Sequence, residues 1–159
     1  MTGKKWLAAA GGLLLLIQIL RPERTNPASD SSLALSQLAS PPAEIELTLK
    51  NACLDCHSNQ TVWPWYSEVA PLSWMIADHV KRGRAELNFS EWGRYQSGER
   101  AHLLKEAQEL LEKREMPPWG YRLFHPEARL SDAEIAALSQ WAERERANLE
   151  ALGKQTGDR

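Results

Sequence analysis

The sequence predicts an all-α fold with long loops. Apolar residues recur every three to four positions in four segments beyond residue 42, which is the spacing of one face of an α-helix. No segment carries a convincing strand pattern of alternating apolar and polar residues. The last helical segment also has a capping box, because Ser131 is followed three residues later by Glu134.

The chain begins with an export-signal pattern at residues 1–20. The basic start MTGKK precedes an uncharged run at 6–20, which is long for a cleavable signal and short for a membrane-spanning helix of about 20 residues. Arginines and prolines follow directly, so we expect an uncleaved anchor with Lys4 and Lys5 on the cytoplasmic side. The alternative is a cleaved signal, for which the triplet SLA at 32–34 is the nearest acceptable site.

A domain boundary is expected near residue 42. Residues 21–42 are rich in proline, serine, alanine and asparagine and have little periodicity, which predicts a flexible linker. The folded domain is then expected over residues 43–153, and residues 154–159 form a polar tail.

Four helices are expected in this domain, over residues 45–56, 71–84, 99–115 and 131–153. The first places Cys53 on its last turn. Pro71 suits the first turn of the second helix, in which His79 shares an apolar face with Met75. Gly153 suits the end of the fourth helix.

Composition excludes one class of partner. The chain has 19 Lys and Arg against 21 Asp and Glu, and the two signs are interleaved. No basic field is available for nucleic acid, so we expect no nucleic-acid partner. Seven tryptophans are a high count for 159 residues, and such rings suit either a core or a large flat ligand.

The main chemical signal is CLDCH at residues 53–57, which holds both cysteines of the chain. Cys-x-x-Cys-His is the pattern of covalent c-type haem attachment. Two thiols bond to the vinyl groups of the haem, and the adjacent imidazole reaches the iron from the same side of the ring. The pattern therefore assigns Cys53 and Cys56 to one covalently bound haem c and His57 to the proximal iron position.

Three other chemistries use cysteines at this spacing. A thioredoxin-like couple needs a βαβ context, which is absent, and a structural zinc site needs two further ligands that no second Cys or close His pair supplies. A disulfide between Cys53 and Cys56 fits an oxidising compartment but leaves His57 unexplained. The export signal and the motif independently favour haem.

The wider sequence resembles a known family. CLDCHSNQTVWPWYSEVAPLSWMIADHV, followed by GRAELNFSEW and MPPWGYRLFHPEARLS, is similar to the bacterial haem-binding domain family. The resemblance covers about residues 43–150. It implies a small cytochrome c-like helical domain with covalent haem c in an exported location, and it implies no known reaction.

Met116 is the leading candidate for the second iron ligand. A thioether suits iron in an electron carrier, and Pro117 should end the preceding helix just before Met116. His79 is the alternative, since we expect it to point inward. His125 or an open sixth position are the remaining possibilities.

Several aromatic and basic residues near the ligands fit a haem pocket, although each also suits ordinary packing or a solvated charge. A Trp N–H, Arg82 or Arg84 could bind a haem propionate. The aromatic candidates are Trp63, Trp65, Tyr66, Trp74, Phe89, Trp92 and Trp119.

Two functions are compatible with these residues. We expect a membrane-tethered periplasmic electron carrier, held at the inner membrane by residues 1–20 and meeting redox partner proteins that the sequence does not name. The alternative is a haem-dependent peroxidase or a gas or redox sensor, which needs an open or displaceable sixth position. The expected location is the periplasmic side of the membrane, or the soluble periplasm if the signal is cleaved. No paired carboxylates indicate catalysis away from haem, so we expect a haem-binding module rather than an enzyme.

Overall fold

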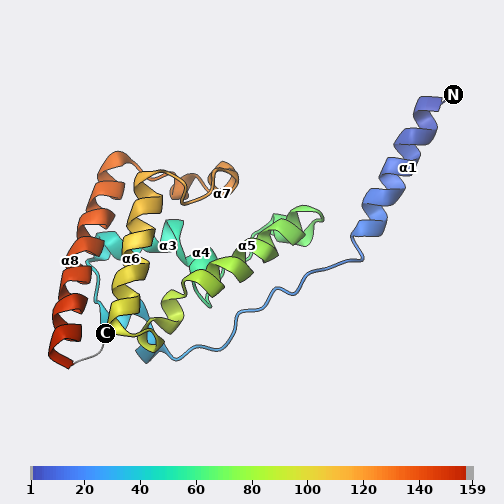
Figure 1. The fold of residues 1–159 in the computed structure, drawn as a ribbon. Coiled ribbons are helices and arrows are strands. Elements are labelled where there is room, and N and C mark those ends of the chain that lie inside the picture. Colours follow the sequence, from blue (N-terminus) through green and yellow to red (C-terminus); the bar gives the residue numbers. More distant parts are fainter. Residues whose placement is uncertain (1, 157–159) are drawn as a thin grey trace.

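The computed structural model describes residues 2–156, which contain helices and no strand (Figure 1). The all-α prediction is confirmed. The α-helices are α1 (Thr2–Ile17), α2 (Leu35–Leu38), α3 (Ala43–Ala52), α4 (Leu54–His57), α5 (Leu72–Glu86), α6 (Ser97–Glu112), α7 (Trp119–Phe124) and α8 (Asp132–Thr156). The 3-10 helices are η1 (Ser31–Leu33), η2 (Trp65–Glu68), η3 (Phe89–Arg94) and η4 (Pro126–Ala128).

The main hydrophobic core lies between α6 and α8, which run side by side at one end of the molecule (Figure 1). Leu104 of α6 and Trp141 of α8 are buried in it, as their positions on the apolar stripes predict. The aromatic segment after α5 was expected as a loop but forms η3, whose Trp92 is 0% exposed. This ring anchors η3 in the main core.

Helix α8 follows its predicted start closely. The backbone N–H of Ser131 donates to Glu134 Oε2 at 2.8 Å, and the backbone N–H of Glu134 donates to Ser131 Oγ at 3.2 Å, which is the expected capping box. The helix does not end at Gly153, which is buried inside it, but continues to Thr156. The expected polar tail therefore starts within α8, and residues 157–159 of it lie outside the described residues.

Helix α1 corresponds to the predicted anchor segment. It has 16 residues, about 24 Å at 1.5 Å per residue, against about 30 Å for the hydrocarbon core of a bilayer. None of the helices between residues 2 and 156 is long and apolar enough to cross a membrane.

The segment expected as a flexible linker, residues 21–42, has definite structure. Its second half forms η1 and α2, and Leu35 of α2 is 3% exposed within the main core. Packing against η3 explains this, because the apolar side chains of LALSQL find a hydrophobic surface that the linear sequence does not reveal. The packed part of the chain thus begins before residue 43.

Leu35→Ala is expected to lower the free energy of unfolding by about 2–5 kcal/mol, the usual cost of deleting a buried leucine side chain. Denaturant unfolding of the purified protein measures this loss. The matched control is Leu38→Ala in the same helix, where the side chain is 48% exposed and the expected loss is smaller. Equal losses for the two variants would show that α2 does not belong to the core.

Candidate functional site

The motif residues are placed by one helical turn. Cys53 is the C-terminal cap of α3, and its backbone N–H donates to the Leu49 carbonyl at 2.8 Å, as expected for the last turn of a short helix. The single turn of α4 follows, with the His57 N–H donating to the Cys53 carbonyl at 2.9 Å. Both thiols and the imidazole therefore come from consecutive turns of nearly continuous helix.

The two thiols are free and only partly exposed. Burial, and then the neighbouring Cys56, raise the pKa of the Cys53 thiol to about 12. Burial, and then Asp55, raise the pKa of the Cys56 thiol to about 11. Dithiol redox enzymes need a lowered thiol pKa, so this environment does not suit a thioredoxin-like couple.

The imidazole of His57 is oriented for a ligand. Its Nδ1 lies 3.0 Å from the backbone oxygen of Leu87, and because a carbonyl only accepts, Nδ1 donates the proton. Burial lowers the pKa of His57, and the hydrogen bond to Leu87 opposes that effect only in part. The ring is therefore neutral near pH 7, with its lone pair on Nε2, which is the tautomer that binds a metal.

Helix α5 supports the motif at very close range. A Cβ built on Gly83 would lie 2.6 Å from the backbone oxygen of Cys56 and 3.0 Å from its carbonyl carbon. Only glycine allows α5 to pack this closely against α4. The sequence carried a signal for this contact, since an isolated glycine inside a helical pattern often marks close packing.

Asp55, which lies between the two thiols, joins the motif to α7. Its Oδ1 accepts the Val62 N–H at 2.9 Å, and its Oδ2 accepts the Tyr121 hydroxyl at 2.7 Å. The Tyr121 ring stacks on His125 with 4.0 Å between centroids, and burial raises the Tyr121 pKa. The sequence gave no sign of this contact, which connects residues 66 positions apart.

Met116 lies in the loop between α6 and α7, and its side chain is 37% exposed. The helix before it ends at Glu112, three residues ahead of the expected end at 115. The loop leads directly into α7, which the Tyr121–Asp55 hydrogen bond holds against the motif. The structure thus ties the loop carrying Met116 to the part of the chain that carries the thiols.

His79 does not point into the core, so that expectation is wrong. Its side chain is exposed, because the buried stripe of α5 is shifted by one position. The close contact of Gly83 with Cys56 determines which face of α5 is buried. His79 lies on a different, more apolar face. The buried residues are Ser73, Ile76, Val80 and Gly83.

The other two histidines are engaged elsewhere. The Tyr66 hydroxyl lies 2.8 Å from His125 Nε2, and Glu127 lies 3.0 Å from His125 Nδ1. Because a carboxylate only accepts, Nδ1 donates to Glu127, and Nε2 accepts from Tyr66 when the ring is neutral. His102 is exposed beside Glu106 at 3.3 Å, as expected of a solvated residue.

The aromatic candidates divide among three environments. Phe89 and Trp92 belong to the main core, although Phe89 also makes an edge contact with the His57 ring at 6.3 Å. Tyr66 and Trp63 form a second cluster that includes Cys56. Trp119 of α7 is exposed. The aromatic residues that contact motif side chains are therefore fewer than the sequence suggested.

The donor set fits a haem attached through two thiols. The thiols are one helical turn apart, and an imidazole whose Nδ1 is held by the Leu87 carbonyl follows them directly. Between residues 2 and 156, no group of three or more His, Cys, Asp and Glu side chains is placed to hold a metal ion.

Comparison with known proteins assigns the chain to a family. No curated protein and no solved structure matches it. The model of a family described as "haem-binding domain" matches residues 12–144, which is most of the chain. The matched range includes the motif, helix α5 and helix α7. The chain belongs to the haem-binding domain family.

Proposed function

We propose that the protein is a c-type haem protein that carries electrons on the periplasmic side of the bacterial inner membrane. Cys53 and Cys56 would attach the haem covalently, His57 would be the proximal iron ligand and Met116 the distal one. Family membership supports haem binding itself. The observation that carries the finer proposal is the Cys-x-x-Cys-His turn with its preset His57 tautomer.

The residues of the chain have distinct tasks in this proposal. When bound, haem supplies an iron that alternates between the ferrous and ferric states. Leu87 holds the proton of the His57 ring on Nδ1 and thereby fixes both the ring orientation and the free Nε2 lone pair. The thioether of Met116 would raise the reduction potential relative to a second imidazole. Partial burial of the motif would reduce access of water to the iron.

The proposed location is supported by the export-signal pattern of residues 1–20. Redox partner proteins would meet the domain in the periplasm. Fractionation of cells that express the protein with a haem c maturation system, followed by intact mass, locates the protein and shows whether its N-terminus is retained.

Met116→Ala is expected to abolish the sulfur-to-iron charge-transfer band of the ferric protein and to produce a high-spin species that binds CO readily. His79→Ala is the matched control and should leave the spectrum unchanged, because His79 is solvated on α5. Optical spectra of the matured variants in both oxidation states measure these effects.

Retention of the charge-transfer band in Met116→Ala would reject the distal assignment. A spectral change in His79→Ala alone would transfer that role to His79. A wild-type protein that is already high-spin and binds CO would favour a peroxidase or sensor over an electron carrier. A matured protein without haem would contradict the proposed function as a whole.

A further inference from the structure

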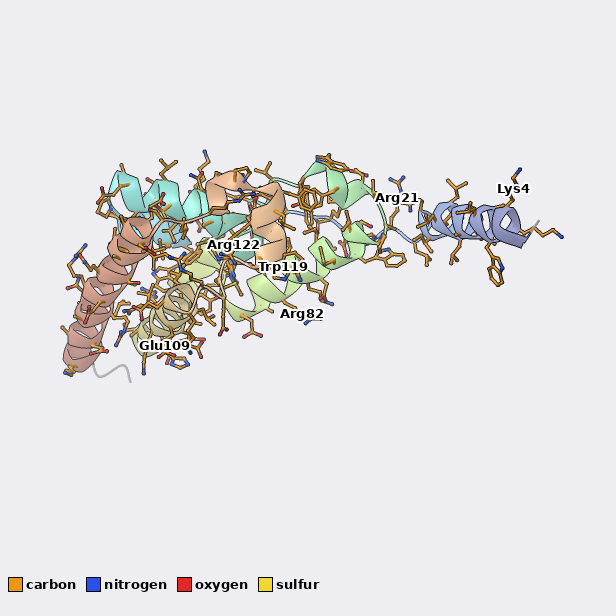
Figure 2. All side chains as sticks on the ribbon, turned by 90° about the horizontal axis from the view of Figure 1, so that it is seen from above. Lys4, Arg21, Arg82, Glu109, Trp119 and Arg122 are labelled. Atoms are coloured by element: carbon orange, nitrogen blue, oxygen red, sulfur yellow. The ribbon has the colours of Figure 1, made fainter. Side chains whose placement is uncertain are left out.

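The chain after α1 is attached to the domain by side-chain hydrogen bonds. The amide group of Gln18 bonds to both backbone groups of Ala70, at 2.9 and 3.1 Å, and Trp74 Nε1 donates to the Leu20 carbonyl at 2.6 Å. Arg21 lies at this junction between α1 and the rest of the molecule (Figure 2). We call residues 18–26 the strap. Its first residues are hydrogen-bonded to the surface of the domain.

The middle of the strap is held by Arg24. Its guanidinium group pairs with both carboxylate oxygens of Glu68, with Nη2–Oε2 at 2.8 Å, and also donates to Ser67 Oγ at 3.1 Å. A bidentate pair of this kind fixes the geometry of both partners. Two residues later, Asn26 Nδ2 donates to the Thr61 carbonyl at 2.9 Å. The strap therefore reaches the loop that follows the haem motif.

Arg84 of α5 joins the strap to that loop. Its Nε donates to the carbonyl of Ser58, the residue directly after His57, at 2.7 Å, and Nη2 donates to Thr61 Oγ1 at 2.8 Å. The same guanidinium group donates to the Thr25 carbonyl at 2.8 Å and to Asn26 Oδ1 at 2.9 Å. One rigid fork thus connects both ends of the 58–61 loop to the strap.

We propose that Arg84 is a positioning residue of the haem site and that strap residues 24–26 are part of the same site. Arg84 acts through Ser58 on His57, and the strap supplies two of the four acceptors that hold the guanidinium group in place. This inference rests on the proposed role of His57 as an iron ligand. It requires the mature protein to retain the strap, because cleavage after the triplet at 32–34 would remove both acceptors.

The test uses the full chain, matured with haem, and three variants. Arg84→Lys keeps the positive charge but lacks the planar fork, so it loses most of these bonds without changing the net charge. Asn26→Ala removes one acceptor and one donor of the strap, far from the motif in sequence. Arg144→Lys is the matched control, since it makes the same change at an exposed side chain of α8.

We expect Arg84→Lys and Asn26→Ala to keep covalent haem and to shift both the reduction potential and the hyperfine-shifted haem-methyl NMR resonances, which depend on the orientation of the axial imidazole. Arg144→Lys should match the wild type. The combined shift of the double variant Arg84→Lys/Asn26→Ala should be less than the sum of the single shifts, because the two residues share one network. The intact mass of the wild type should include residues 18–26.

Potentials and NMR shifts of Arg84→Lys and Asn26→Ala equal to those of Arg144→Lys would overturn the inference. A mature, haem-loaded wild type that begins at Leu35 would also overturn it. If Arg84→Lys does not fold, the test rests on Asn26→Ala. An unchanged reduction potential and NMR spectrum in Asn26→Ala would then reject the inference. A wild type without haem would instead contradict the proposed function, so the two failures are distinguishable.

Discussion

The double variant Cys53→Ala/Cys56→Ala is expected to release all of its haem into acidified organic solvent, whereas the matured wild-type protein retains its haem. Two thioether bonds survive denaturation, while coordination through His57 alone does not. Intact mass provides the second measurement, since the wild type should be heavier than the bare chain by one haem. This is the largest effect that we expect of any substitution in the chain.

The two single variants, Cys53→Ala and Cys56→Ala, are the controls for this experiment. Each should keep haem through the single thioether bond that the remaining cysteine would form. If the wild type releases all its haem under the same conditions, attachment is not covalent. The chain would then remain a haem-binding protein by family, and the c-type assignment would be abandoned.

Gly83→Ala is expected to lower the free energy of unfolding by about 1–3 kcal/mol and to reduce haem incorporation. Alanine within a helix normally stabilises by about 0.5–1 kcal/mol relative to glycine. At Gly83, however, the new methyl group would lie 2.6 Å from the Cys56 oxygen, and overpacking of this kind costs about 1–3 kcal/mol or more. The atoms that it meets are backbone atoms, so relief requires α4 and the motif to move.

Gly120→Ala in α7 is the matched control, because a Cβ at this position meets nothing within 4 Å. At Gly120 only the higher helix propensity of alanine acts, and we expect the free energy of unfolding to rise by up to about 1 kcal/mol. Thermal or denaturant unfolding and the haem-to-protein ratio measure both variants. A change of the same sign in the two would show that the close approach of α5 to α4 is not a constraint.

Local patterns identified the helices because each depends on residues within a few positions of one another. The capping box at Ser131 was correct for this reason. The ends of the helices were predicted less accurately. Helix α8 continues beyond Gly153, and α6 ends at Glu112 instead of residue 115. Burial of that glycine is a tertiary effect, and it overrides the usual preference for glycine at a helix end.

The inward direction assigned to His79 failed for a related reason. Periodicity finds the more apolar face of a helix, but the face that is buried depends on what the helix packs against. In α5 the close contact of Gly83 with Cys56 sets that face, and His79 is left in solvent. The contacts of residues 21–42 could not be predicted for a similar reason, because the partners of Arg24 and Asn26 are 35 to 44 residues away.

The sequence by itself determined the helical class and, through the resemblance of about residues 43–150 to a haem-binding family, the group that the chain binds. Only the tertiary structure decided which carbonyl orients His57, which glycine lets α5 approach the motif, and that residues 18–26 lie against the domain. The physical reason is range. Helix formation and motif spacing are set by near neighbours, whereas hydrogen bonds such as His57–Leu87 and Arg84–Thr25 join residues 30 and 59 positions apart and exist only after the chain has packed.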